Sequence, residues 1–172
     1  MPAREASRAR SRRATRVAEA APPERAAQPR RTALFDTNVL LDVVLAREPW
    51  AGVATALLDA AARGIVHAYV ASHALTTIHY IVEREHGRTA AVTAVSDLLD
   101  IVDVVELGSD DFRRALALTL ADFEDAVQVA ACLRAGANVL VTRNARDFKG
   151  APIAVQSPAE LLAFLGGGRS TE

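Results

Sequence analysis

The fold is decided by one stretch of the chain, Thr32-Ala33-Leu34-Phe35-Asp36-Thr37-Asn38-Val39-Leu40-Leu41-Asp42. Its first four residues form the pattern of a buried strand. That pattern stops at Asp36, and apolar residues at helical spacing follow. An aspartate at the carboxyl end of an early strand lies where open α/β sheets bind their ligands. The first question is therefore which other residues join Asp36 at that edge.

Strand and helix patterns alternate along the rest of the chain. Further strands are expected at 65–70, 102–107 and 138–142, with a short edge strand at 152–155. The segments between them repeat apolar residues at helical spacing. Strands separated by helices pair in parallel through right-handed crossovers, with helices on both faces of the sheet. The sequence therefore predicts an α/β fold, a three-layer α/β/α sandwich with a mainly parallel sheet of about four to five strands.

Capping residues mark the expected helix ends. Ser72 is expected to cap a helix that runs to Gly87, and Asp122 to cap a helix that Gly136 closes. The last helix is expected to start at Ser157-Pro158-Ala159-Glu160, which carries a capping serine, a first-turn proline and a first-turn acid. These signals place the acidic segment that begins at Asp122 on the first turn of a helix.

The composition fits one soluble domain. At 172 residues, 51% hydrophobic and 24% charged, the chain is long enough to bury a core. Its single cysteine, Cys132, is expected to be buried and reduced, in keeping with a cytoplasmic protein. Trp50 and Tyr80 are expected to pack in the core or on a dimer face. No apolar run approaches the roughly 18 residues of a membrane span.

Charge is divided unevenly between the start of the chain and the rest. Residues 1–31 hold nine arginines and three glutamates, a net charge of +6, which leaves −7 for the remainder. They hold few large apolar side chains, so we expect a disordered basic tail, then a folded domain at 32–165 and a flexible tail at 166–172. A basic tail attracts nucleic acid, and an acidic body attracts metal cations. A transit peptide, a dispensable extension and an upstream start codon are alternatives for the tail.

Three polar groups are candidates for chemistry: Asp36; Asp122-Phe123-Glu124-Asp125; and Thr142-Arg143-Asn144-Ala145-Arg146-Asp147-Phe148. Each also has a purely structural interpretation, as an Asx-turn or cap at Asp36, a helix cap at Asp122 and a polar turn after Thr142. Asp36 and Thr142 both close parallel strands, which brings them to the same edge of the sheet. Carboxylates gathered there repel one another unless a hard cation neutralises them. Mg²⁺ or Mn²⁺ would suit such a site and the hydrolysis of a phosphodiester.

The order and spacing of these three motifs resemble the PIN-domain family, and most closely its VapC-like ribonuclease toxins of type II toxin–antitoxin systems. The resemblance spans roughly residues 32–164. It implies a PIN-like fold and a metal-dependent endoribonuclease that cleaves single-stranded or loop RNA with Mg²⁺ or Mn²⁺ and an activated water. It also implies a homodimer and a cognate antitoxin protein whose tail blocks the acidic site.

The resemblance assigns roles to individual residues. Asp36 corresponds to the first metal-binding aspartate of the family, and Asp125 to the later acid carried by a helix. Thr142 corresponds to the hydroxyl residue near the first aspartate, and Asn38 to the small polar residue that supports it. The catalytic pair expected from the resemblance is therefore Asp36 and Asp125.

The sequence departs from the family pattern at two positions. Thr77 stands where the family usually has a glutamate on the helix after the second strand, and Asn144 stands at the fourth acid. Asn144 can ligate a metal only through its neutral carbonyl. Glu124 or Asp122 is expected to complete the metal shell. The lost charges predict a weaker metal site, a nuclease that demands Mn²⁺, or a loss of catalysis.

Other polar residues near these motifs have less definite roles. Arg143 or Arg146 would steady the scissile phosphate, although turn arginines are often simply solvated. Asp147 either supports the site or forms a cap or an ion pair with one of these arginines. Three histidines of the helix after the second strand lack the spacing of a transition-metal site and are expected to be surface or packing residues: His73, His79 and His86.

Three functions follow from these patterns. The first is a Mg²⁺- or Mn²⁺-dependent endoribonuclease that acts as a toxin. The second, motivated by Thr77 and Asn144, is a catalytically weakened PIN-like module that binds RNA or a protein partner. The third is a phosphatase of the haloacid-dehalogenase type, which also begins with a strand-end aspartate. That type needs a second aspartate where this chain has Asn38, and a catalytic lysine, whereas Lys149 lies in a polar turn.

Overall fold

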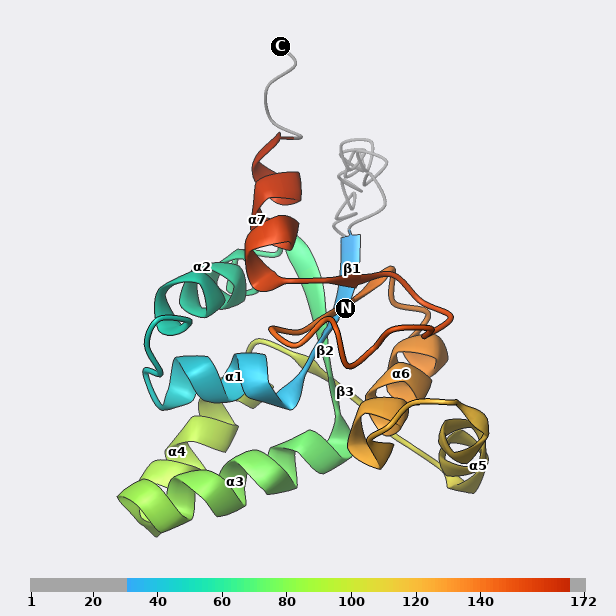
Figure 1. The fold of residues 1–172 in the computed structure, drawn as a ribbon. Helices are drawn as coiled ribbons and strands as arrows, with labels where there is room; N and C mark the ends of the chain where they lie inside the picture. The colour runs from blue at the N-terminus through green and yellow to red at the C-terminus, as the bar shows by residue number, and fades with distance from the viewer. Residues whose placement is uncertain (1–30, 168–172) are drawn as a thin grey trace, which may run out of the picture.

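Five parallel strands form the centre of the computed structural model, which describes residues 31–167 (Figure 1). They are β1 (Arg31–Phe35), β2 (Val66–Ala71), β3 (Asp103–Val105), β4 (Val139–Val141) and β5 (Val155–Gln156). Their order in the sheet is β3-β2-β1-β4-β5. Because the chain runs outward from β1 first to one side and then to the other, the carboxyl end of β1 is the switch point at which such sheets bind ligands.

Helices cover both faces of this sheet. They are α1 (Thr37–Val44), α2 (Ala51–Ala62), α3 (Ser72–His86), α4 (Arg88–Leu99), α5 (Ser109–Ala117), α6 (Phe123–Ala135) and α7 (Pro158–Gly167). Figure 1 shows α5 and α6 on one side of the sheet, with α1 and α2 on the other. The predicted three-layer α/β/α fold with a parallel sheet is confirmed.

The central strand β1 contributes to both cores of the protein. Ala33 and Phe35 pack into the larger apolar core with α1, α2, α3, α4 and α7. Leu34 packs into the second core with α6 and β4. All three side chains have no exposed surface, which is the continuous apolar run expected of a strand buried on both faces. This burial fixes the end of β1, and with it the position of Asp36.

Of the helix ends predicted at Ser72, Gly87, Asp122 and Gly136, the one at Ser72 is wrong and the other three are confirmed. The Oδ1 atom of Asp122 accepts hydrogen bonds from the amides of Glu124 and Asp125, at 2.7 and 3.4 Å. Gly136 ends α6 with a left-handed φ of 60°, a conformation that glycine adopts without strain. Ser72 is not a cap, because β2 runs directly into α3 and Ala71 occupies the cap position.

The last helix starts as the sequence predicts. The backbone amide and the hydroxyl of Ser157 both donate to Glu160 Oε2, at 2.7 and 2.8 Å, and the Glu160 amide donates back to the hydroxyl. The edge strand expected at 152–155 is found instead at Val155–Gln156. Pro152 has no amide hydrogen to contribute to a ladder, which accounts for the later start.

The first strand and the last helix mark the two ends of the described residues. Arg31 already belongs to β1, and Gly166 and Gly167 end α7. The guanidinium of Arg31 lies 4.1 Å from the centre of the Phe164 ring, so α7 returns to the start of β1. The predicted tails lie otherwise outside the described residues.

Three expectations about single side chains have different outcomes. Cys132 is buried and free, as expected, and burial raises the pKa of its thiol to about 12. Trp50 and Tyr80 are 42% and 58% exposed, so their expected place in the core is wrong. Each instead stacks with an arginine, since Arg143 lies over the Trp50 ring and Arg84 over the Tyr80 ring.

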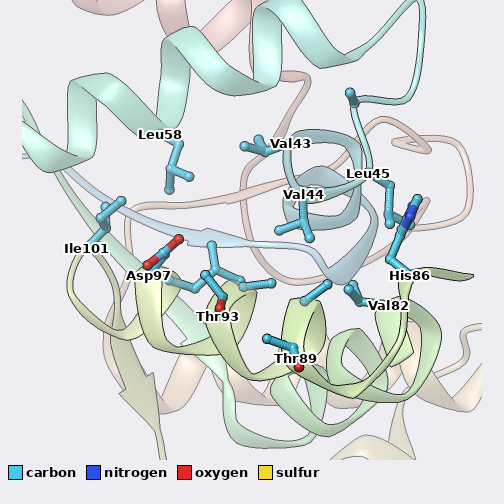
Figure 2. A pocket seen from close by; sticks show the side chains of 14 residues that line it. Val43, Val44, Leu45, Leu58, Val82, His86, Thr89, Thr93, Asp97 and Ile101 are labelled. Atoms are coloured by element: carbon cyan, nitrogen blue, oxygen red, sulfur yellow. The ribbon is translucent and has the colours of Figure 1, made fainter. Parts of the chain in front are cut away.

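An apolar groove of about 820 Å³ lies between the end of α1 and α2 on one side and α3 and α4 on the other. Figure 2 shows Val44, Leu58 and Val82 around it, with Thr93 and Asp97 along the α4 side. No helix within residues 31–167 is long and apolar enough to cross a membrane.

A buried ion pair joins α1 to the turn after β4. Arg143 Nη1 lies 2.7 Å from Asp42 Oδ1, and the Asp42 side chain is only 2% exposed. Burial raises the pKa of Asp42, and the charge of Arg143 opposes that rise. The same guanidinium lies 4.4 Å from the centre of the Trp50 ring, just before α2. The Arg143 side chain therefore connects the turn after β4 with α1 and with the residue that precedes α2.

We expect Arg143→Ala to destabilise the protein by about 3 kcal/mol, because the substitution leaves the Asp42 carboxylate buried without its partner. Urea unfolding measures the change. Arg146→Ala is the matched control, since Arg146 is exposed and forms no ion pair within the described residues. It should change the free energy of unfolding by no more than about 0.5 kcal/mol. Equal stabilities of the two variants would contradict this account of the ion pair.

Candidate active site at the carboxyl edge of the sheet

Asp36 lies between β1 and α1 and is only 4% exposed. Its Oδ2 atom accepts a hydrogen bond of 2.8 Å from Thr142 Oγ1, and its backbone amide donates to the Val141 carbonyl at 2.9 Å. The Asn144 amide in turn donates to Thr142 Oγ1 at 3.0 Å. The ends of β1 and β4 therefore meet as the parallel pairing predicts, and Thr142 orients the Asp36 carboxylate.

Asp36 occupies the cap position of α1, but its side chain makes no hydrogen bond of full capping geometry to the helix. Its geometrically well-formed side-chain hydrogen bond is the one from Thr142. Burial raises the pKa of Asp36, while the Thr142 hydrogen bond and the nearby amides of Asn38 and Thr37 lower it. The negative charge of Glu124 raises it further. Asp36 is thus a desolvated carboxylate close to the carboxylate of Glu124.

The first turn of α6 supplies the other acids. Burial raises the pKa of Asp125 to about 6, and the charges of Asp122, Asp36, Asp147 and Glu124 raise it in the same direction. Asp122 Oδ1 already accepts hydrogen bonds from two amides of the helix, as the interpretation of Asp122 as a helix cap predicts. The structure therefore brings together the five carboxylates that the sequence singled out, and their charges repel one another.

Glu124 is held by a chain of polar side chains. Thr37 Oγ1 donates to Glu124 Oε1 at 3.4 Å, and Gln128 Nε2 donates to Thr37 Oγ1 at 2.9 Å. Gln128 has no exposed surface, and its Oε1 atom has no partner within the described residues. Sequence reasoning missed Gln128, although one amide in the apolar run of α6 was a signal that it contacts something polar.

His73 also lies at this site, which the sequence did not predict. Its Nε2 atom lies 3.9 Å from Glu124 Oε1. Burial lowers the pKa of His73, and the charge of Glu124 opposes that change. The spacing could have indicated this position, because His73 precedes Thr77 by one helical turn and therefore lies on the same face of α3. The Thr77 hydroxyl donates to the His73 carbonyl at 3.3 Å.

The remaining candidate residues lie in the turn after β4, where one arginine is paired and the other is not. Arg143 forms an ion pair with Asp42, so its guanidinium is not available to bind a phosphate group. Arg146 and Asn144 are exposed at the turn. Asp147 is exposed too and forms no ion pair with either arginine within the described residues, and its amide donates to the Asn144 carbonyl at 2.9 Å. Arg146 is therefore the arginine of this turn that remains available to a ligand.

The residues fit a hard divalent cation. Within residues 31–167 no lysine or arginine pairs with the five carboxylates, so their repulsion has no internal counter-charge. In that part of the chain no group of three or more His, Cys, Asp or Glu side chains is close enough, as placed, to hold a metal ion by itself. Mg²⁺ typically takes one or two carboxylates and keeps several waters, so such a set suits it better than a closed zinc site. The available donors are the carboxylates of Asp36, Asp125 and Glu124 and the side-chain carbonyl of Asn144, whose backbone carbonyl already accepts from Asp147.

Comparison with known proteins identifies the family and the fold. A family model described as "PIN domain" matches residues 32–146, from β1 to the turn after β4. The DNA-bound VapBC of Salmonella typhimurium is similar in fold, with 16% identity, a TM-score of 0.59 and coverage of 74% of this chain and 98% of that one. A toxin–antitoxin complex from Klebsiella pneumoniae has 24% identity, a TM-score of 0.55 and coverage of 73% and 97%.

A third solved structure is a VapC toxin of Mycobacterium tuberculosis that cleaves the sarcin–ricin loop. It has 20% identity, a TM-score of 0.52 and coverage of 63% of this chain and 86% of that one. No curated protein sequence matches the chain. At these identities the solved structures establish a shared fold.

The raised pKa of Asp125 gives a pH-dependent stability in the absence of metal. Its pKa of about 6 exceeds the roughly 3.9 of an unfolded aspartate, so the folded state holds the proton more tightly. The stabilisation is fully present below about pH 4 and is lost as the pH rises through about 6. Since Asp125 is only half-buried, screening leaves about 1 kcal/mol of the effect.

Asp125→Asn removes this titration. Urea unfolding in EDTA, at pH values from about 4 to about 7, should therefore show the unmodified protein losing about 1 kcal/mol relative to the variant. The raised pKa of Asp36 makes the stability of both the unmodified protein and the variant fall with rising pH. The difference between their two pH profiles therefore reports the titration of Asp125. Parallel pH profiles of the two proteins would show that Asp125 is not perturbed by its neighbours.

Proposed function

The chain belongs to the PIN-domain family, and we propose that it is a metal-dependent endoribonuclease that acts as the toxin of a toxin–antitoxin pair. The observation that carries this proposal is the gathering of Asp36, Glu124 and Asp125 at the switch point of the sheet without an internal counter-charge. A site of this kind binds a divalent cation and, through it, a phosphate group.

The proposed cofactor is Mg²⁺ or Mn²⁺. Asp36 and Asp125 would hold it, with Glu124 and the Asn144 carbonyl completing the protein part of the shell. Glu124 is preferred to Asp122, because two helix amides already occupy Asp122 Oδ1. When bound, the ion would neutralise the carboxylates, polarise the phosphodiester and activate a water molecule.

The remaining residues of the site orient these groups. Thr142 fixes Asp36 by its 2.8 Å hydrogen bond, and Thr37 holds Glu124. Arg146, exposed at the turn after β4, would contact the scissile phosphate in place of Arg143. We propose RNA as the substrate, supported by the fold shared with a toxin that cleaves the sarcin–ricin loop.

We expect Asp36→Asn to abolish RNA cleavage in Mg²⁺ or Mn²⁺, because the substitution removes the most desolvated charge of the site while keeping its shape. The assay incubates purified protein with a total-RNA or tRNA pool, with an EDTA control. Asp59→Asn is the matched control, because Asp59 is exposed on α2. This variant should cleave RNA like the unmodified protein. Undiminished cleavage by Asp36→Asn would remove Asp36 from the catalytic site.

A weakened RNA-binding module is the second candidate. It is favoured by Thr77, whose hydroxyl bonds its own helix instead of supplying an acid to the site, and by the neutral Asn144. In that case RNA binding would persist in EDTA and no divalent metal would produce cleavage. The same assay, with a binding measurement added, separates the two functions.

The apolar groove supports a protein partner. The groove exposes apolar side chains between helices, among them those of Val44, Leu58, Val82 and Ala94. Grooves between helices of this kind bind the apolar face of an amphipathic helix. The fold is shared with toxins solved together with their antitoxins. We therefore propose that a helix of a cognate antitoxin occupies the groove, with a homodimer in the cytoplasm as the further expectation for the complex.

Ala94→Glu places a charge in this groove and should disrupt antitoxin binding. Val92→Glu is the matched control, because Val92 lies on the same helix but is 54% exposed and does not line the groove. Tagged protein expressed from its native locus should retain a small protein of the same transcription unit with Val92→Glu and lose it with Ala94→Glu. Retention by both variants would place the partner elsewhere.

A further inference from the structure

The carboxyl end of β2 lies beside Asp36 but contributes no acid to the site. β2 pairs with β1 along its length, and α3 follows it directly. No acid occurs in residues 71–82. Thr77, at the position where an acid was expected, directs its hydroxyl to the His73 carbonyl instead. Any contribution from this side of the site must therefore come from a different residue.

His73 is the ionisable side chain that this edge offers. It is the second residue of α3, one turn before Thr77, and its ring lies beside Glu124. Both ring nitrogens are buried and have no hydrogen-bond partner within the described residues. An imidazole with two unsatisfied nitrogens in a desolvated place is costly unless it binds something. The distance of 3.9 Å from Nε2 to Glu124 Oε1 is too long for a hydrogen bond.

A simple ion pair between His73 and Glu124 does not explain this arrangement. At that separation the contact leaves both ring nitrogens of His73 without a hydrogen-bond partner within the described residues, so Glu124 does not satisfy the imidazole. The same atom, Glu124 Oε1, accepts a hydrogen bond of 3.4 Å from Thr37, whose hydroxyl in turn accepts one from the fully buried Gln128. The imidazole of His73 and the carboxylate of Glu124, which lie side by side, form a mixed donor pair of nitrogen and oxygen for a cation.

We propose that His73 is an additional metal ligand, whose imidazole nitrogen joins the Glu124 carboxylate in binding the divalent cation. The inference rests on the proposed function and extends its donor set, which otherwise consists of oxygen atoms. A nitrogen donor strengthens binding of Mn²⁺ and later transition metals relative to Mg²⁺, which favours oxygen ligands. It also replaces a ligand that the chain lacks at Thr77.

The test uses Mn²⁺ alone and detects the nitrogen directly. Electron spin-echo envelope modulation of Mn²⁺ bound to the full chain should show a coordinated imidazole nitrogen. The signal should disappear in His73→Ala and persist in His79→Ala, a matched control on the same helix that faces Glu83. Affinity for Mn²⁺ should fall at least roughly tenfold in His73→Ala, since even outer-shell partners of metal sites are worth about that much. Affinity for Mg²⁺ should change less.

A second variant guards against misfolding. His73→Gln keeps a polar side chain of similar size, and it should fold normally by circular dichroism while losing the nitrogen signal. Mn²⁺ binding without any nitrogen modulation, and with equal affinity in His73→Ala, would overturn the inference. RNA cleavage by the unmodified protein, absent in Asp36→Asn, would in that case leave the proposed function intact. A failure of Mn²⁺ to bind at all would overturn both.

Discussion

The hydrogen bond from Thr142 Oγ1 to Asp36 Oδ2 is the interaction on which the site depends. It can form only because β1 and β4 are adjacent parallel strands that end at the same level, so that a side chain following one reaches a side chain following the other. The apolar burial of β1 on both faces fixes that level. The same burial desolvates Asp36, which raises its pKa and makes its charge dependent on a counter-ion.

Repulsion among the acids then shapes the rest of the edge. Asp122 is neutralised in part by the amino end of α6, where helix amides and the helix dipole favour negative charge. Asp125 is half-buried and Glu124 is exposed, and the charge of each meets that of Asp36. A structure that holds like charges together in this way stores energy that a bound cation releases, which is a common cost of keeping a functional site ready.

The sequence was sufficient for the fold and for the acids at strand and helix ends. Asp36, Thr142 and the start of α6 could be placed because parallel strands share an edge and caps mark helix starts. Trp50 could not be placed, because its stacking on Arg143 depends on the buried Asp42 from another helix. His73 and Gln128 were missed for a related reason. Their roles depend on how closely α3 and α6 approach Glu124, and no local pattern reports that distance.

The start of β1 and the end of α7 have a consequence for how the domain can be combined with others. Arg31 contacts Phe164, so the two ends of the described domain are neighbours, at the amino edge of the sheet and opposite the site. Neighbouring ends allow a domain to be inserted into a loop of another protein without being pulled apart. Fusion partners joined at either end would leave the carboxyl edge accessible. The fold is therefore modular, and the carboxyl edge of its sheet is independent of what the ends are joined to.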